Sequence, residues 1–278
     1  MARQRLGQHF LTDPGWRENI ARAIGISPHS IGGSRHDSSD DFCWIEIGAG
    51  HGEMTQHLAA TGAPVHAVEL DKSLATRLGS LTERFPNLTA INGDVLQTDL
   101  HTLAAGRRVR LYGNLPYYIT SPILHHFFAF ASIVDEIHIV IQLEVAFRLI
   151  ARPETRDYAY LSVLTQFFSK PNLALKIPRG AFRPPPQVGS ALVSLRLPGE
   201  RAALPFGNDA SAESDFLDFV KLCFSQKRKT LLNNLRPLAS PGQVRQTLAS
   251  LDLRADARAE QLTVKQLASL FSRLKATP

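Results

Sequence analysis

The fold is decided by Phe42-Cys43-Trp44-Ile45-Glu46-Ile47-Gly48-Ala49-Gly50-His51-Gly52. Its first six residues are mostly apolar and rich in strand formers, which predicts a buried β-strand. Three glycines at alternate positions follow, and they permit a tight turn in which a ligand can lie against bare backbone. A helical pattern then continues to about Ala60. A strand, a glycine turn and a helix in this order predict the first unit of a parallel α/β sheet.

Apolar runs and helical patterns alternate through the first two-thirds of the chain. Further strands are expected at 65–69, 88–92, 109–112, 137–142 and 191–197, helices at 72–84 and 123–130, and a polar loop at 32–41. The strand at 191–197 is expected to form an antiparallel edge pair with the region 173–177. Near-continuous apolar strands separated by helices are typical of a sheet covered on both faces. The predicted fold class is α/β, with a Rossmann-like domain built on a mostly parallel seven-stranded sheet.

The C-terminal part differs in composition. Residues 198–213 are rich in Pro, Gly, Ala and Ser, which predicts a linker between domain 1–200 and a small all-helical domain over 214–278. The helical domain contains 11 Lys and Arg against 5 Asp and Glu, and the rest of the chain is neutral. A basic module indicates an anionic macromolecular partner. A solvated basic helix face is the alternative.

Composition limits the class of protein further. The 278 residues are 44% hydrophobic and 20% charged, which is typical of a soluble globular protein. No apolar run approaches the length of about 20 residues that crosses a bilayer, and no apolar signal segment follows the basic start. We therefore expect a cytoplasmic protein with no membrane partner. Cys43 and Cys223 lie in apolar contexts and predict buried thiols, not a disulfide or a metal site.

Three consecutive strand ends carry groups that can hold a nucleoside. The glycine spacing is G-x-G-x-G, which does not clearly call for a pyrophosphate. Glu69 ends the second strand, 21 residues after Gly48, where a carboxylate can accept from both ribose hydroxyls. Asp94 ends the third strand and can accept from an adenine amino group. A nucleoside without phosphate indicates S-adenosylmethionine, with an NAD-dependent oxidoreductase as the alternative.

The run Gly113-Asn114-Leu115-Pro116-Tyr117 joins an amide, a rigid turn and an aromatic ring at a strand end. The Asn114 amide can accept a hydrogen bond from an exocyclic amino group, and Tyr117 offers a face for an unstacked base. Pro116 has no N–H, so the carbonyl before it is free of ladder bonding. This combination suits a flat, amine-bearing heterocycle. An ordinary strand exit with a packed Tyr is the alternative.

With these residues assembled, the chain resembles the ribosomal RNA adenine dimethyltransferases of the KsgA type, almost from end to end. The motifs that carry the resemblance are Gly7-Gln8-His9-Phe10-Leu11, the Gly48 loop, Glu69, Asp94, Asn114-Leu115-Pro116-Tyr117, Glu144-Val145-Ala146, Arg148-Leu149, Leu161-Ser162-Val163, Ala181-Phe182 with Pro184-Pro185-Pro186, Arg228-Lys229-Thr230 and Asn234-Leu235. The Asn-Leu-Pro-Tyr run is specific to amino-group methylases. The three prolines after Phe182 make the match to this family more specific.

The resemblance implies a site for the methyl donor S-adenosylmethionine. Its expected residues are His9, Leu11, Gly48, Gly50, Glu69, Leu70, Asp94, Val95 and Asn114. The N-terminal segment closes over the donor, and donor and target meet at Asn114. The family reaction places two methyl groups on the exocyclic nitrogen of each of two adjacent adenines near the 3′ end of small-subunit (16S) rRNA, during ribosome biogenesis.

The chemistry needs positioning more than a strong base, because the sulfonium methyl already has a good leaving group. If the Asn114 side chain and the Leu115 carbonyl accept the two amino hydrogens, the lone pair of the adenine nitrogen localises. The expected catalytic set is Asn114, Leu115, Pro116, Tyr117 and Phe182, with the two rings sandwiching the unstacked base and no metal required. For Phe182 the alternative is a core aromatic.

Basic residues are expected to hold the RNA. Lys227-Arg228-Lys229 and Lys221 are predicted on one helix that follows a phosphate backbone, and Arg179 and Arg183 flank Phe182. A solvated helix face is the alternative. The expected partner is small-subunit rRNA or the immature small ribosomal subunit, bound by a monomer.

Several positions depart from the family pattern, and most of them lie on the expected RNA side: His9, Tyr118, Leu143, Tyr160, Gln187 and Gly189. They leave the donor pocket nearly intact and bear on which RNA is methylated. Two other functions therefore stay open. One is a large-subunit rRNA adenine methylase of the macrolide-resistance type, and the other is a non-catalytic RNA-binding assembly or transcription factor on the same fold.

Overall fold

The computed structural model describes residues 9–26, 41–116, 119–204, 206 and 209–275. The chain divides into two compact units, one made of Met1–Ala146 and Asn172–Leu197, the other of Phe147–Pro171 and Pro198–Pro278. Residues 147–171, which the sequence placed with the catalytic domain, thus fall into the second unit. The expected linker at 198–213 includes a 3-10 helix, η4 (Glu200–Ala203).

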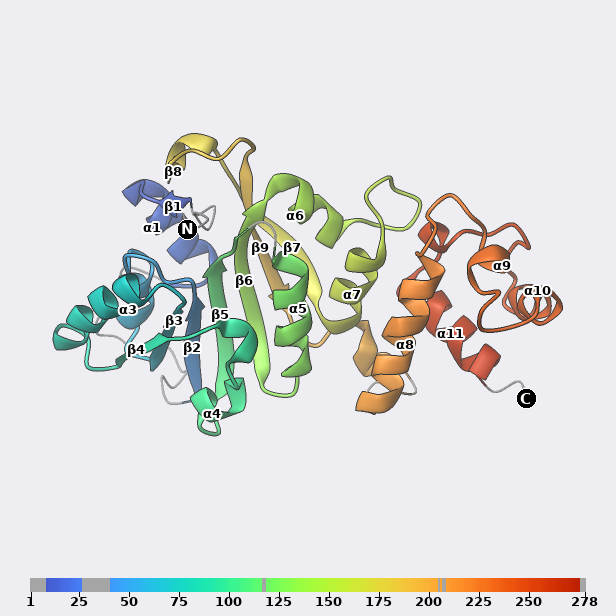
Figure 1. The fold of residues 1–278 in the computed structure, drawn as a ribbon, viewed down its shortest axis with the longest axis horizontal. Coiled ribbons are helices and arrows are strands. Elements are labelled where there is room, and N and C mark those ends of the chain that lie inside the picture. The colour runs from blue at the N-terminus through green and yellow to red at the C-terminus, as the bar shows by residue number, and fades with distance from the viewer. Residues whose placement is uncertain (1–8, 27–40, 117–118, 205, 207–208, 276–278) are drawn as a thin grey trace, which may run out of the picture. The chain divides into compact units, whose positions relative to one another are not determined.

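The first unit is organised by a seven-stranded sheet of order β4-β3-β2-β5-β6-β9-β7 (Figure 1). Its strands are β2 (Phe42–Ile47), β3 (Val65–Glu69), β4 (Leu88–Asn92), β5 (Arg108–Asn114), β6 (Val134–Gln142), β7 (Lys170–Ile177) and β9 (Ser190–Arg196). The pairs among β2 to β6 are parallel, and β9 runs antiparallel to β6. The predicted mostly parallel α/β sheet is confirmed, and β9 and β7 lie together at one edge as expected.

Helices follow the strands of the first unit. They are α1 (Pro14–Ala23), α2 (Thr55–Ala59), α3 (Lys72–Gly79), α4 (Leu100–Ala104) and α5 (Thr120–Ala129), with 3-10 turns η1 (Ser80–Glu83), η2 (Val95–Gln97) and η3 (Arg179–Ala181). α6 (Leu143–Ile150) begins in the first unit and ends in the second. α1 begins where the Asp13 side chain accepts a hydrogen bond from the Trp16 amide at 3.0 Å, with Pro14 in the first turn. Cap and proline together set the direction in which α1 leaves the N-terminal strand.

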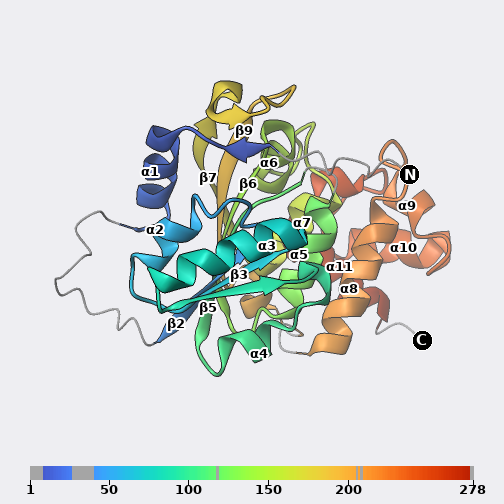
Figure 2. The ribbon, with the colours of Figure 1, turned by 60° about the vertical axis from the view of Figure 1, so that its left-hand side comes forward.

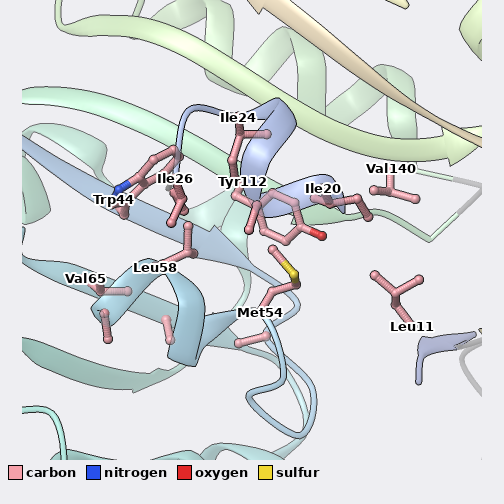
Figure 3. Close-up of a cluster of buried hydrophobic side chains, with 14 of the residues drawn as sticks. Leu11, Ile20, Ile24, Ile26, Trp44, Met54, Leu58, Val65, Tyr112 and Val140 are labelled. Carbon is pink, nitrogen blue, oxygen red and sulfur yellow. The ribbon is translucent and has the colours of Figure 1, made fainter. Parts of the chain in front are cut away.

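α1 packs on the centre of the sheet. Figure 3 shows Ile20 of α1 and Ile24, the residue just after α1, near the Tyr112 ring of β5, with Trp44 of β2 and Met54 in the same cluster. These side chains are almost fully buried. Because a buried aromatic removes roughly 150–250 Å² of surface from water, this cluster holds α1 on the sheet beside the strand ends.

A second, two-stranded sheet forms at the N-terminus, which the sequence did not predict. β1 (Phe10–Leu11) pairs antiparallel with β8 (Phe182–Arg183), and in Figure 2 the blue N-terminal strand lies next to the yellow segment that contains β8. The amides of Thr12 and Asp13 both donate to the Ala181 carbonyl, at 3.0 and 3.2 Å. Residues 9–12, called the strap below, are thereby fixed to the segment 178–189.

The second unit is helical, as predicted for the C-terminal part. Its helices are α7 (Tyr160–Phe168), α8 (Ala210–Cys223), α9 (Leu231–Asn234), α10 (Pro241–Ala249) and α11 (Val264–Lys275), with a 3-10 turn η5 (Ala259–Gln261). Aromatic rings form its core, with centroids of Phe167 and Phe216 5.1 Å apart and of Phe216 and Phe271 5.7 Å apart.

Three further expectations concern single features. Cys43 and Cys223 are both buried and free, which confirms the predicted buried thiols. Among the described residues, no helix has the length and apolar character needed to span a membrane. Most of the polar loop expected at 32–41 lies outside the described residues.

Candidate functional site

The glycine loop after β2 is held against Glu69. Gly48, Gly50 and Gly52 have φ values of 65°, 59° and 85°, a left-handed backbone that favours glycine. The Glu69 carboxylate is buried and accepts from the amides of Gly50 and Asp71, both at 2.9 Å. Carboxylate and loop therefore form one rigid cradle, and each carboxylate oxygen keeps a further lone pair for a ligand.

An apolar side chain stands exposed beside this acid. Leu70 is 56% exposed, and its backbone is fixed because the Asn92 side chain donates to the carbonyls of Glu69 and Leu70 at 3.0 and 3.1 Å. Asp94 starts η2 by accepting from the Leu96 amide at 2.9 Å, and Val95 is buried behind it. An exposed apolar residue next to fixed acids suits the face of a heterocycle.

Asn114 ends the central strand β5 next to the loop. A Cβ on Gly48 would lie 3.9 Å from the Asn114 carbonyl oxygen. A Cβ on Gly113 would lie 2.9 Å from a Leu115 methyl and 3.2 Å from the Ile47 backbone oxygen, so glycine is required at that position. The Leu115 amide donates to the Val140 carbonyl at 3.0 Å, which fixes the strand exit.

The turn after Leu115 is only partly described. The Pro116 carbonyl accepts from the Ile119 amide at 3.2 Å, just ahead of α5. Tyr117 and Tyr118 lie outside the described residues, so the base-stacking role of Tyr117 stays a prediction.

The strap lies across the glycine loop. A Cβ on Gly50 would meet the Phe10 ring at 3.1 Å, and the rings of Phe10 and His51 have centroids 4.6 Å apart. The Asn114 side-chain amide donates to the His9 carbonyl at 2.8 Å. The strap thus brings His9 to Asn114 and Phe10 to the glycine loop, whereas Leu11 is buried opposite Phe182. That this segment closes over a methyl donor stays a prediction.

Phe182 is placed differently from the expectation. Its ring has no exposed surface and belongs to the main hydrophobic cluster, opposite Leu11 in the β1–β8 pair. Stacking on a base would require the strap to leave this ring. Arg179 and Arg183, expected to clamp phosphates, donate to backbone carbonyls of their own segment, Arg179 to Pro186 at 2.7 Å.

Glu46 is a feature of this site that the sequence reasoning missed. The side chain is 2% exposed and lies opposite Tyr112 in the β2–β5 register. Burial, with the nearby carboxylates of Glu53 and Glu69, raises the pKa of Glu46 to about 8. Within the described residues, neither its Oε2 nor the Tyr112 hydroxyl has a hydrogen-bond partner. The sequence feature that could have identified Glu46 is a single carboxylate within the apolar strand Phe42–Ile47.

The predicted helix carrying the basic residues is wrong in its extent. α8 ends at Cys223, and the buried Asn234 side chain donates to the carbonyls of Cys223 and Gln226 at 2.6 and 3.2 Å. Residues 227–229 are exposed in the turn that follows. Lys221 is on α8 and is ion-paired with Asp218 at 2.8 Å. These cations belong to the second unit.

Sheet order, glycine loop, acid at the end of β3 and Asn114 together define a Rossmann-like methyltransferase of the S-adenosylmethionine-dependent class. The model of the ribosomal RNA adenine dimethylase family matches residues 1–276, and the chain belongs to that family.

Curated relatives agree with this assignment. The chain is 37% identical over 284 residues to "Ribosomal RNA small subunit methyltransferase A" of Koribacter versatilis, covering 98% of this chain and 94% of that protein. It is 36% identical to the protein of the same name from Alkaliphilus metalliredigens, with 98% and 91% covered.

Two solved structures are similar along nearly the whole chain. A dimethyladenosine transferase from Plasmodium falciparum has a TM-score of 0.77 at 23% identity, with 96% of this chain and 98% of that chain covered. The 23S rRNA methyltransferase ErmE has a TM-score of 0.67 at 25% identity, with 96% and 99% covered. The first of these supports the fold alone.

Proposed function

We propose that the protein transfers methyl groups from S-adenosylmethionine to the exocyclic N6 of two adjacent adenosines near the 3′ end of small-subunit rRNA. The observation that carries the proposal is the placement of Asn114 against the Gly48 loop, inside a chain of the adenine dimethylase family. The curated relatives named for the small subunit favour that RNA over the large-subunit RNA named for ErmE. A donor cradle beside Asn114 favours an enzyme over a non-catalytic binder.

The donor cradle fits a nucleoside with an amino-acid tail. Glu69 is positioned to accept from the ribose hydroxyls, and Leu70 supplies an apolar surface for the adenine, with Asp94 at its polar edge. The left-handed glycines leave bare backbone for the tail. When bound, S-adenosylmethionine supplies an activated methyl group on a sulfonium.

The target amino group is activated by hydrogen bonding. Asn114 Oδ1 and the Leu115 carbonyl oxygen accept its two hydrogens, which localises the nitrogen lone pair toward the methyl group. The site then has to hold the adenine N6, the methyl carbon and the sulfonium sulfur in one line, and this alignment lowers the barrier. No strong base is needed before the transfer. The proton released afterwards passes to solvent.

The RNA backbone is bound in this proposal by the exposed turn of the second unit. Lys227, Arg228 and Lys229 are consecutive and exposed, and the Lys227 ammonium donates to the Arg156 carbonyl at 2.5 Å. That contact brings the loop bearing Arg156 next to the cationic turn. The proposed partner is the immature small ribosomal subunit. In this proposal the protein binds it as a monomer in the cytoplasm.

Mass spectrometry of small-subunit rRNA from a deletion strain tests the function. We expect loss of N6-dimethyladenosine, restored by the wild-type gene and not by Asn114→Ala. Unchanged dimethyladenosine in the deletion strain would refute the substrate assignment.

A further inference from the structure

The Asn114 side chain has a defined orientation in this structure. One of its terminal atoms lies 2.8 Å from the His9 carbonyl oxygen. A carbonyl oxygen can only accept, so the atom facing it is the amide nitrogen, and Oδ1 points to the other side. Among the described residues, no donor is paired with Oδ1. The orientation therefore leaves an acceptor open at the end of β5.

His9 is itself held from two directions. Its ring Nδ1 lies 2.7 Å from the Pro184 carbonyl oxygen, so Nδ1 carries the hydrogen of that bond. On the other side, the strap is fixed by the Phe10–Arg183 register and by the Thr12 amide, which donates to Ala181. The carbonyl that orients Asn114 is thus attached to the segment 178–189, far away in the sequence.

We infer that His9 is a positioning residue for methyl transfer: its carbonyl holds the Asn114 amide so that Oδ1, and not the NH2 group, faces the target amino group. This inference rests on the proposed function and deepens it. An amide turned by 180° would set its NH2 group against the adenine NH2 group, two donors without an acceptor. In the described part of the chain, the His9 carbonyl is the hydrogen-bond partner that distinguishes the two amide orientations.

The test uses an isosteric pair at position 9. Asn can donate to the Pro184 carbonyl and Asp cannot, so His9→Asn retains the anchor and His9→Asp loses it. At saturating donor and RNA, we expect kcat to fall about 10- to 100-fold in His9→Asp and His9→Ala, less than for removal of an oriented group, because Asn114 is misoriented and not lost. We expect His9→Asn to stay within about threefold of wild type. Glu18→Gln, at an exposed position on α1 outside the strap, is the control and keeps wild-type kcat.

Two readouts separate orientation from donor contact. Calorimetry with S-adenosylhomocysteine gives the donor-site Kd, and the ¹⁵N-labelled side-chain amide of Asn114, assigned through Asn114→Ala, reports its hydrogen bond. We expect the Asn114 amide signals to shift and lose exchange protection in His9→Asp and His9→Ala alone. Unchanged amide signals, or a change in Kd with kcat intact, would overturn the inference. If the wild-type enzyme methylated no rRNA, the proposed function would fail, and the amide signals would still decide the orientation.

Discussion

The donor cradle of the first unit and the cationic turn of the second are built in opposite ways. In the cradle, backbone amides fix the carboxylate of Glu69, and the strap covers the glycine loop. In the turn, residues 227–229 are exposed, and neighbouring Lys221 shares its charge with Asp218. A fixed, buried site loses function in large steps when one group changes. An exposed set of cations loses affinity gradually and in a salt-dependent way.

The largest effect is expected at Asn114. Asn114→Ala removes the acceptor for the target amino group, and we expect single-turnover methyl transfer to fall about 10²- to 10³-fold. The donor Kd should change far less, because the cradle itself is intact. Asn19→Ala, which removes an amide on α1 that accepts from Arg22, is the control and keeps its rate. A rate near wild type in Asn114→Ala would contradict the expectation that single changes have larger effects at the donor site than at the cationic turn.

The next largest effect is expected at the glycine loop. Gly50→Ala places a methyl group 3.1 Å from the Phe10 ring, on a left-handed residue, so the Phe10 ring of the strap must shift by a few tenths of an ångström and the loop backbone is strained. We expect donor affinity measured by calorimetry to fall at least about tenfold, or about 1.4 kcal/mol. Gly62→Ala is the matched control, because Gly62 is also left-handed and has nothing within 4 Å of the new methyl. Equal donor affinity in the two variants would show that the strap does not press on the loop.

Glu46 makes the stability of the first unit depend on pH. Its pKa is raised to about 8 by burial, so the folded state binds a proton that the unfolded chain has lost. The contribution of protonated Glu46 to the free energy of unfolding is fully present below the unfolded pKa near 4.3. It decreases by about 1.4 kcal/mol per pH unit as the pH rises from there toward 8.

Urea unfolding from pH 5 to 8 measures this dependence. The stability of wild type relative to Glu46→Gln should decrease as pH rises, whereas Glu83→Gln, at an exposed position on η1, should run parallel to wild type. Parallel curves for all three proteins would contradict the buried, protonated state of Glu46.

The smallest effect is expected on the RNA side. Arg228→Ala should weaken binding to small-subunit rRNA a few-fold and reduce the slope of log K against log salt by about 0.7 to 0.9. Lys265→Ala, an exposed cation on α11, should leave the slope unchanged. The measurement is a salt titration of binding. Identical slopes for both variants and wild type would place the RNA elsewhere.

Local patterns predicted what depends on local chemistry. The apolar strands and the glycine loop are encoded in consecutive residues, so β2 to β6 and the acids at their ends were placed correctly. β1 and β8 are two residues each, and they exist because segments more than 170 positions apart meet. The burial of Phe182 and the orientation of Asn114 likewise come from distant partners. The periodic patterns of apolar residues that indicate helices and strands do not indicate such long-range contacts.

We propose that the cradle and Asn114 together deliver methyl groups to adenine N6 in small-subunit rRNA. The most direct test is incorporation of labelled methyl groups from S-adenosylmethionine into immature small subunits, naked small-subunit rRNA and large subunits side by side, followed by nucleoside analysis. We expect N6-dimethyladenosine in small-subunit rRNA and none in large subunits. Label confined to large-subunit rRNA, or no label in any substrate, would contradict it.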